Sequence, residues 1–178
     1  VIKGGSKTYV TALTASFKDK IRLSTPVTGV KREKEAVVVS SAQGEERYDA
    51  VFFACHSDQA LRLLEQPTAS EQQVLGAIKY QENEVLLHTD ASILPKRKTA
   101  WAAWNYHLLE NDQGQVPVTY NMNILQGLDS DQTFCVTLNN SNAIDQTKVL
   151  KRLQYHHPIY TQESVSYTHL TLPTTPYV

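Results

Sequence analysis

Apolar residues follow two different patterns along the first half of the chain. In residues 6–20 the apolar residues Val10, Leu13 and Phe17 have a helical spacing, which predicts a helix. Ser6 is a good N-cap for this helix. Residues 21–51 instead read as strands, with a hairpin turn at Gln43-Gly44. The segment from Tyr48 to Ala54 ends in an unbroken apolar run, which predicts a strand buried on both faces of a parallel sheet.

Two further helices are predicted after this run. Ser57 is suited to begin the first, and the S-x-x-Q pattern of Ser70 and Gln73 predicts the start of the second. From residue 80 onward the pattern changes to strands separated by short loops, at 84–89, 100–107, 116–123, 133–138 and 149–156. This order predicts an antiparallel sheet, with a boundary between two structural regions near residues 66–80.

Composition and charge exclude several classes of protein. The chain has 178 residues with 17 Lys and Arg against 18 Asp and Glu, so it lacks the basic surplus of a nucleic-acid-binding protein. The longest apolar run, Ala50–Cys55, is far shorter than the roughly 20 residues of a transmembrane helix. Cys55 and Cys135 form neither a disulfide framework nor a metal-binding pattern, so we expect buried free thiols and a cytoplasmic location.

Two segments resemble a known family. Ile21–Val30 contains Thr25-Pro26-Val27, and Tyr48–His56 ends in Ala54-Cys55-His56. In this order they resemble the FAD-binding half of flavin-containing amine oxidases and related phytoene-desaturase-like oxidoreductases. The resemblance implies that the backbone of Val27 contacts the adenine part of FAD and that Ala54 and Cys55 pass close to the cofactor. His56 departs from the family pattern, which has a small residue at this place.

The pair Gly4-Gly5 before the first predicted helix also fits this family. Glycines let the backbone approach a ligand closely, and a helix N-terminus offers free N–H groups. The resemblance continues over residues 1–163, to a bacterial subgroup described as predicted NAD/FAD-binding or amine-oxidase-like proteins. The segments that carry it are Val1–Ser6, Phe53–Ala60, Trp104–His107 and Tyr155–Tyr160.

The resemblance implies an α/β plus α+β fold. We expect a partial Rossmann-like FAD-binding domain with a β-meander over residues 1–66, then a partial, mainly antiparallel-sheet substrate domain over residues 67–163. The family's N-terminal GxGxxG and closing C-terminal FAD segment have no counterpart here, so we expect an internal fragment of a longer enzyme. Residues 164–178, uncharged from Val165 onward, look like translated adapter read-through of a metagenomic reading frame, and we expect a non-native tail.

Several side chains are candidates for chemistry or binding. Cys55-His56 could form a thiolate–imidazole pair and His156-His157 a metal site, but neighbours on a strand point to opposite faces, so a structural role is favoured for both pairs. The same alternation separates Trp104 and Tyr106 from Asn105 and His107. The substrate-lining candidates are Trp104, Tyr106 and Tyr120, with a sheet core as the alternative role for these rings.

The resemblance implies the function. We expect part of an FAD-dependent oxidoreductase that oxidises an amine-like organic substrate by hydride transfer to FAD. One alternative is an FAD-dependent desaturase or isomerase acting on a lipid-like hydrophobe. Another is a binding module without enzymatic activity, built on the antiparallel sheet. The sequence identifies no catalytic acid or base and no metal site.

Overall fold

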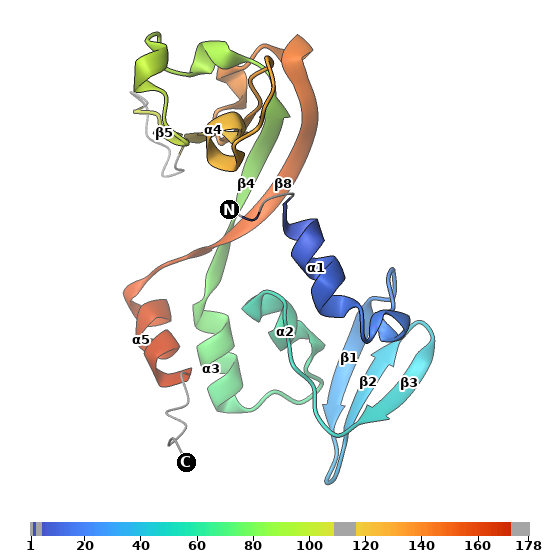
Figure 1. The fold of residues 1–178 in the computed structure, drawn as a ribbon. Coiled ribbons are helices and arrows are strands. Elements are labelled where there is room, and N and C mark those ends of the chain that lie inside the picture. The colour runs from blue at the N-terminus through green and yellow to red at the C-terminus, as the bar shows by residue number, and fades with distance from the viewer. Residues whose placement is uncertain (1, 3–4, 109–116, 172–178) are drawn as a thin grey trace, which may run out of the picture. The chain divides into compact units, whose positions relative to one another are not determined.

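The computed structural model describes residues 2, 5–108 and 117–171, which form two compact units (Figure 1). One unit comprises Val1–Lys18 and Glu82–His157, and the other comprises Asp19–Gln81 and Pro158–Val178. We call them the sheet unit and the meander unit. The expected division at residue 66, and the expected tail from residue 164, stay predictions.

The meander unit is built on a three-stranded antiparallel sheet. Its strands are β1 (Val27–Arg32), β2 (Val37–Ser41) and β3 (Gly44–Tyr48), joined in the order β1-β2-β3. Val30 and Val38 are buried, and the first residues after α2 (Ser57–Leu63) join β1 through a parallel bridge between Val30 and Leu64. Helix α2 also packs against α3 (Ala69–Ala77), and α3 against α5 (Gln162–Thr171).

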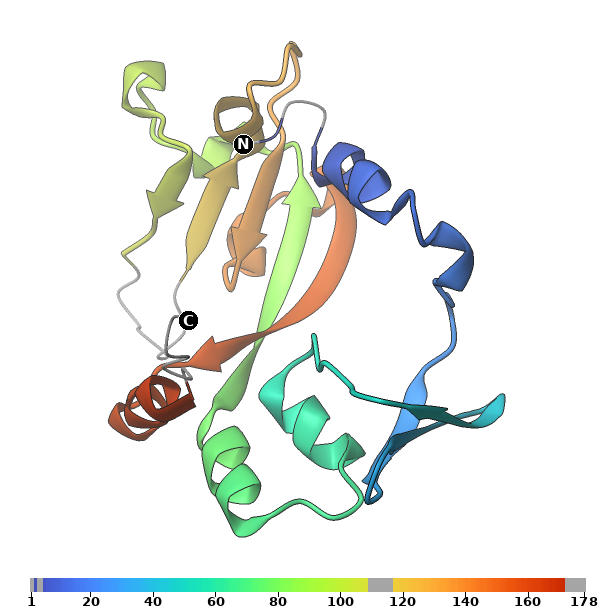
Figure 2. The same ribbon diagram turned by 60° about the horizontal axis from the view of Figure 1, so that its bottom comes forward.

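The sheet unit holds five strands in the order β5-β6-β7-β4-β8, which lie side by side in Figure 2. The strands are β4 (Lys79–His88), β5 (Trp104–Tyr106), β6 (Val118–Asn121), β7 (Cys135–Leu138) and β8 (Val149–Ile159). Antiparallel ladders join β5 to β6, β6 to β7 and β7 to β4. The antiparallel sheet expected from the sequence is therefore confirmed.

Short helices complete the sheet unit. They are α1 (Ser6–Thr14), α4 (Met122–Gln126) and the 3-10 turns η2 (Ala91–Ile93), η3 (Lys98–Ala100), η4 (Ser141–Ala143) and η5 (Gln146–Lys148); the turn η1 (Lys18–Lys20) lies where the two units meet in the sequence. The first helix begins at Ser6, but the capping position belongs to Gly5, which has φ of +79°. The helix ends at Thr14, earlier than expected.

The strand expected to be buried on both faces does not form. Strand β3 ends at Tyr48, residues 51–54 pair with no strand in the described part of the chain, and Phe52 is 95% exposed. A strand of a parallel sheet is held by neighbours on both edges, and no such neighbour is described for this segment. As a consequence Cys55 is exposed, which corrects the expectation of two buried thiols, while Cys135 is buried.

The start of α3 is also shifted from the expected position. Thr68, not Ser70, caps the helix: its hydroxyl accepts from the Glu71 N–H at 3.2 Å, and Glu71 Oε2 accepts from the Thr68 N–H at 2.8 Å. This is a T-x-x-E capping box two residues before the predicted S-x-x-Q box. Glu71 is further held by Arg32, whose Nη2 donates to Oε2 at 2.9 Å, so the earlier box gains an ion pair with β1.

Candidate functional site

An exposed aromatic face lies on the five-stranded sheet. Trp104, Asn105 and Tyr106 alternate along β5 with exposed fractions of 66%, 9% and 59%. Trp104 lies directly opposite Tyr120 on β6, and their rings meet edge to face with centroids 5.6 Å apart. The aromatic face is therefore made of Trp104, Tyr106 and Tyr120, and the structure brings together all three residues that the sequence offered as substrate-lining candidates. Whether they line a substrate stays a prediction.

The opposite face of the same sheet is polar and buried. Six side chains from four strands share it, all at most 9% exposed, and they are His88, Asn105, Thr119, Asn121, Cys135 and Thr137. The strand ladders place Thr119 opposite Thr137, and place both Asn121 and His88 opposite Cys135. A buried polar group is costly unless it is hydrogen-bonded, so this polar face requires a satisfied network.

Most of the polar face meets that requirement. Asn105 donates to the carbonyl oxygens of Ala102 and Thr119 and accepts from the Ala102 N–H. Asn121 Oδ1 accepts from the Ile124 N–H and caps α4, while its buried Nδ2 has no hydrogen-bond partner among the described residues. Burial raises the pKa of the Cys135 thiol to about 11, with Asp90 adding to the effect, so this cysteine is not a nucleophile at neutral pH.

Asp90 joins the loops that follow β4 and β7. Its Oδ1 accepts from the N–H and hydroxyl of Ser92 and from Lys148 Nζ, and its Oδ2 accepts from the Asp145 N–H at 2.9 Å. Burial by itself would raise the pKa of Asp90, but these hydrogen bonds outweigh it and hold the pKa well below its usual range. The carboxylate is therefore charged and fully engaged in holding the loops.

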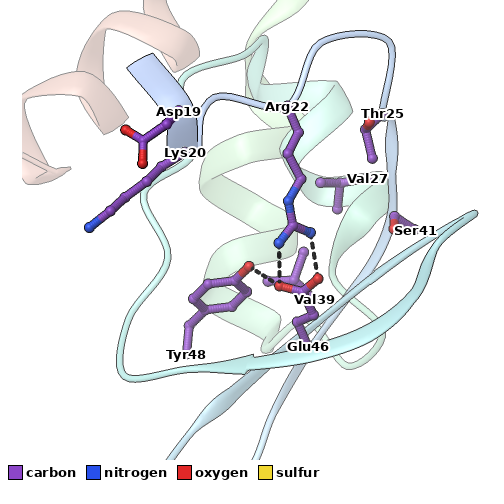
Figure 3. Close-up of a pocket in the computed structure, with 9 residues that line it drawn as sticks. All are labelled: Asp19, Lys20, Arg22, Thr25, Val27, Val39, Ser41, Glu46 and Tyr48. Atoms are coloured by element: carbon purple, nitrogen blue, oxygen red, sulfur yellow. Dashed lines mark hydrogen bonds and ion pairs between the residues drawn. The ribbon is translucent and has the colours of Figure 1, made fainter. Parts of the chain in front are cut away.

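A hollow of about 610 Å³ lies on the meander unit around Val27 (Figure 3). Val27 and Val39 supply apolar wall, and Figure 3 shows Arg22 reaching down to Glu46. Arg22 and Glu46 form a two-pronged ion pair, and the Tyr48 hydroxyl donates to Glu46 Oε2 at 2.6 Å. The hydrogen bonds from Arg22 and then Tyr48 lower the pKa of Glu46. The remaining lining residues are Asp19, Lys20, Thr25 and Ser41.

This hollow suits one end of an extended cofactor. Its volume lies within the range of roughly 300–1,000 Å³ that small-molecule sites occupy, and it combines apolar wall with hydrogen-bonding groups. Val27 is partly exposed at its edge, as a residue that contacts a ligand must be. The hollow is therefore large enough for one end of an extended cofactor, and the contact of Val27 with FAD stays a prediction.

The other predicted cofactor residues lie elsewhere. Gly5 has the positive φ expected of a glycine that precedes a helix, and Gly4 lies outside the described residues. Ala54 and Cys55 are exposed in the meander unit, directly before α2. Their neighbour His56 stacks on Tyr80 with ring centroids 4.3 Å apart, and the Tyr80 hydroxyl accepts from the Ser57 N–H at 2.9 Å. The roles of these residues toward a cofactor stay predictions.

The histidine pair of β8 separates as strand geometry requires. His156 Nε2 lies 3.8 Å from Glu82, and His157 Nδ1 bonds Asn83 at 2.9 Å. In the part of the chain that the structure describes, no group of three or more His, Cys, Asp or Glu residues could hold a metal ion.

Sequence reasoning did not single out Tyr80 or the polar face. The polar face had a signal in the sequence, because Thr119 and Asn121, then Cys135 and Thr137, are spaced two apart on predicted strands. Alternation alone does not tell which side of the sheet is buried. The structure buries these small polar residues and leaves the aromatic side exposed.

Comparison with models of protein families identifies the family of this chain. The model of the family described as flavin containing amine oxidoreductase matches residues 1–133. The chain belongs to this family. Comparison with curated protein sequences gives no match. The fold of the chain, a mixed α/β structure with two antiparallel sheets, is similar to part of the fold of FAD-dependent oxidoreductases.

Solved structures similar to this member of the amine oxidoreductase family support that fold. A protein assigned as a protoporphyrinogen oxidase from Exiguobacterium sp. 255-15 matches with a TM-score of 0.62 and 11% identity over 96% of this chain. A triple mutant of putrescine oxidase matches with a TM-score of 0.53 and 14% identity over 82% of this chain. A CLA-producing fatty acid isomerase from P. acnes matches with a TM-score of 0.52 and 14% identity over 88% of this chain. The chain spans only 43%, 32% and 39% of these three chains.

No helix among the described residues is long and apolar enough to cross a membrane.

Proposed function

We propose that the protein containing this chain is an FAD-dependent oxidoreductase that oxidises an amine-like small molecule. The family match supports the reaction class. The proposal that the substrate binds at the sheet rests on one observation, the exposed Trp104–Tyr120 pair. Large aromatic rings on the solvent side of a sheet are the kind of surface that binding sites use.

The aromatic face supplies what a cationic amine needs for binding. A protonated amine is attracted to the face of an aromatic ring, most strongly that of tryptophan. Trp104 and Tyr106 lie next but one on β5, and Tyr120 sits across from Trp104, so their rings offer adjacent surfaces to one ligand. In this proposal the rings bind and orient the substrate.

We propose that the hollow at Val27 holds the adenine end of FAD, with Gly4, Gly5, Ala54 and Cys55 as further contacts. When bound, the flavin supplies the electron acceptor, and hydride transfer from the substrate is the proposed reaction. The residues of this chain position the cofactor: Val27 contributes apolar wall and backbone, and the Arg22–Glu46 pair contributes a hydrogen-bonded part of the lining.

A desaturase or isomerase acting on a lipid-like hydrophobe is the second candidate. The aromatic face also carries partly buried aliphatic residues, because Val118 lies opposite Tyr106 and Val136 opposite Tyr120. Such a surface binds an apolar chain as readily as an amine. The similarity in fold to the fatty acid isomerase is compatible with this candidate.

The two candidates are separated by anaerobic reduction of the flavin in the intact protein. Primary and secondary amines should bleach the flavin absorbance under the first proposal, and long-chain unsaturated lipids should leave it oxidised. Bleaching by lipids alone would favour the second candidate. Neither class producing a change would contradict the amine and desaturase proposals. An isomerase is redox-neutral and leaves the flavin oxidised, so it is tested by movement of the double bond in the recovered lipid.

Substitution tests the aromatic face directly. Trp104→Ala and Tyr120→Ala should each weaken binding of the reducing substrate at least tenfold. Tyr160→Ala, at an 83% exposed tyrosine of the meander unit, is the matched control and should leave binding unchanged. Binding within twofold of wild type in both aromatic-face variants would show that this face does not contact substrate.

A further inference from the structure

Four side chains form an unbroken line of hydrogen bonds across the polar face. His88 Nε2 lies 2.8 Å from Thr137 Oγ1, Thr137 Oγ1 lies 2.8 Å from Thr119 Oγ1, and Thr119 Oγ1 lies 2.8 Å from His107 Nε2. The line starts on β4, crosses β7 and β6, and ends one residue after β5. We call these four residues the relay. Its first three members are buried, and His107 is partly exposed.

The direction of every hydrogen bond in the relay follows from one backbone group. His88 Nδ1 lies 3.1 Å from the Asp90 backbone nitrogen, which can only donate. Nδ1 of His88 must therefore be the unprotonated nitrogen, and in the neutral ring the proton is on Nε2. Nε2–H then donates to Thr137. Thr137 and Thr119 carry one hydroxyl hydrogen each, and both hydrogens have an acceptor in the relay only if Thr137 donates to Thr119 and Thr119 donates to His107 Nε2.

This direction determines the state of His107. Its Nε2 accepts from Thr119, so the proton of the neutral ring is on Nδ1. A proton on Nε2 would take away the acceptor of the Thr119 hydroxyl hydrogen, which could then be satisfied only if Thr119 donated to Thr137 and Thr137 donated to His88. That reversal ends at His88, whose Nε2 carries a hydrogen and whose Nδ1 is occupied by the Asp90 N–H. The relay therefore opposes both the other tautomer and the charged ring.

We propose that His88 is a positioning residue that acts through two threonines to hold His107 as the Nδ1–H tautomer. His107 then offers a ligand a hydrogen-bond donor at Nδ1 and cannot act there as a base. A neutral imidazole of fixed tautomer suits the polarisation of an acceptor oxygen or nitrogen on an uncharged group. The proposal concerns the ring state itself and does not rest on the identity of the substrate.

The surroundings of the two rings agree with a neutral relay. Burial lowers the pKa of His88, with Asp90 acting in the opposite direction, and burial alone lowers the pKa of His107. The ionisable groups near the His88 end are Asp90, which Lys148 neutralises at 3.2 Å, and the cross-strand neighbour Cys135. The donor to His88 Nδ1 is the Asp90 backbone N–H, and none of these ionisable groups replaces it.

The test is nitrogen NMR of the intact protein labelled with ¹⁵N in histidine, because protonated and unprotonated ring nitrogens have widely separated shifts. At pH 7 the expected spectrum has His88 protonated at Nε2 and His107 protonated at Nδ1. His107 in the Nε2–H form, or as an imidazolium, would overturn the proposal from the wild-type spectrum alone.

His88→Glu provides the sharper test, because it does not touch His107. An ionised carboxylate only accepts, so Thr137 must donate to it, Thr119 must donate to Thr137, and His107 should change to the Nε2–H form. Thr119→Val should release His107 to both tautomers while leaving His88 unchanged. Thr133→Val, a partly exposed threonine just before β7, is the matched control and should change neither ring. An unchanged Nδ1–H form of His107 in folded His88→Glu would refute action through the relay.

A chemical measurement gives an independent result. Diethyl pyrocarbonate modifies the unprotonated nitrogen of a neutral histidine, and in His107 that nitrogen is held by Thr119. His107 should therefore react at least tenfold more slowly than His56 and His156, whose side chains are 39% and 50% exposed. Thr119→Val should abolish most of this difference. Equal reaction of His107 and His156 in the wild-type protein would contradict the engaged Nε2.

Discussion

Trp104 and Tyr120 lie directly opposite each other on β5 and β6, with ring centroids 5.6 Å apart and ring planes at 73°. This edge-to-face arrangement places the positive rim of one ring on the negative face of the other. Because Trp104 is largely exposed, the pair contributes to sheet stability through this contact more than through burial.

The pair should show a measurable coupling. In a double-mutant cycle of Trp104→Ala and Tyr120→Ala, we expect an interaction free energy of about 0.5–1.5 kcal/mol. The measurement is chemical unfolding of the intact protein, followed by tryptophan-independent circular dichroism. The cycle of Trp104→Ala with Tyr160→Ala serves as control and should show no coupling. Strict additivity in both cycles would mean that the rings do not stabilise each other.

Removal of the Asp90 charge should destabilise the sheet unit. In Asp90→Asn an amide donor replaces an oxygen that accepts from Asp145 or from Ser92 and Lys148, so at least one buried group loses its partner. We expect a loss of about 1–3 kcal/mol at pH 7. Asp145→Asn is the comparison, since Asp145 is more exposed and bonds locally to Thr147, and it should cost less.

The start of α3 should be sensitive to acid. Hydrogen bonds from Arg32 and Thr68 lower the pKa of Glu71 from 4.5 to about 2. A carboxyl with a lowered pKa stabilises the folded state above pH 4.5 and loses that contribution as the pH falls toward 2. The protection factors of the first-turn amides of α3, which compare exchange with its intrinsic rate, should therefore fall between pH 4.5 and 2.

Substitution separates this effect from general acid unfolding. Glu71→Gln should accelerate the same amides at pH 7 and remove the pH dependence, and Thr68→Ala should cost about 1 kcal/mol through loss of the cap. Glu65→Gln, at a carboxylate outside this capping box, is the control. An identical acid response in wild type and Glu71→Gln would assign the transition to other groups.

The two cysteines should differ in reactivity. Burial raises the pKa of the Cys135 thiol to about 11, whereas Cys55 is exposed. At pH 8 iodoacetamide should label Cys55 in the native protein and leave Cys135 unmodified until denaturant is added. Mass spectrometry after proteolysis distinguishes the sites. Labelling of Cys135 at the rate of Cys55 in native protein would contradict the buried position on the polar face.

The sequence predicted the antiparallel sheet because strand-like segments follow one another from residue 80 onward with short loops between them. Alternation within a strand is visible in Trp104, Asn105 and Tyr106, since their exposure alternates as a strand requires. The pattern could not tell which side is buried. Small polar residues such as Thr119 and Thr137 form cross-strand hydrogen bonds only once the register is set, and the register depends on pairs 18 residues apart.

The failures of prediction have physical causes as well. The run before Cys55 has the composition of a central strand, but strand formation requires a partner for its backbone groups, and the described chain gives it none. The sequence offers two overlapping capping boxes for α3, at Thr68 and at Ser70, and the ion pair between Arg32 and Glu71, 39 residues apart, favours the first. Local pattern could not decide either case, because each depends on whether a distant partner is present.

The contrast between the two faces of the sheet has a consequence for how this protein can diverge. On the polar face the hydrogen-bonded residues depend on one another, so a single change among them leaves a buried group without a partner and selection must retain them together. On the aromatic face Trp104 and Tyr106 are mostly exposed, so replacing them costs little folding stability. New ligand preferences can therefore arise on one side of the sheet while the other side preserves the fold.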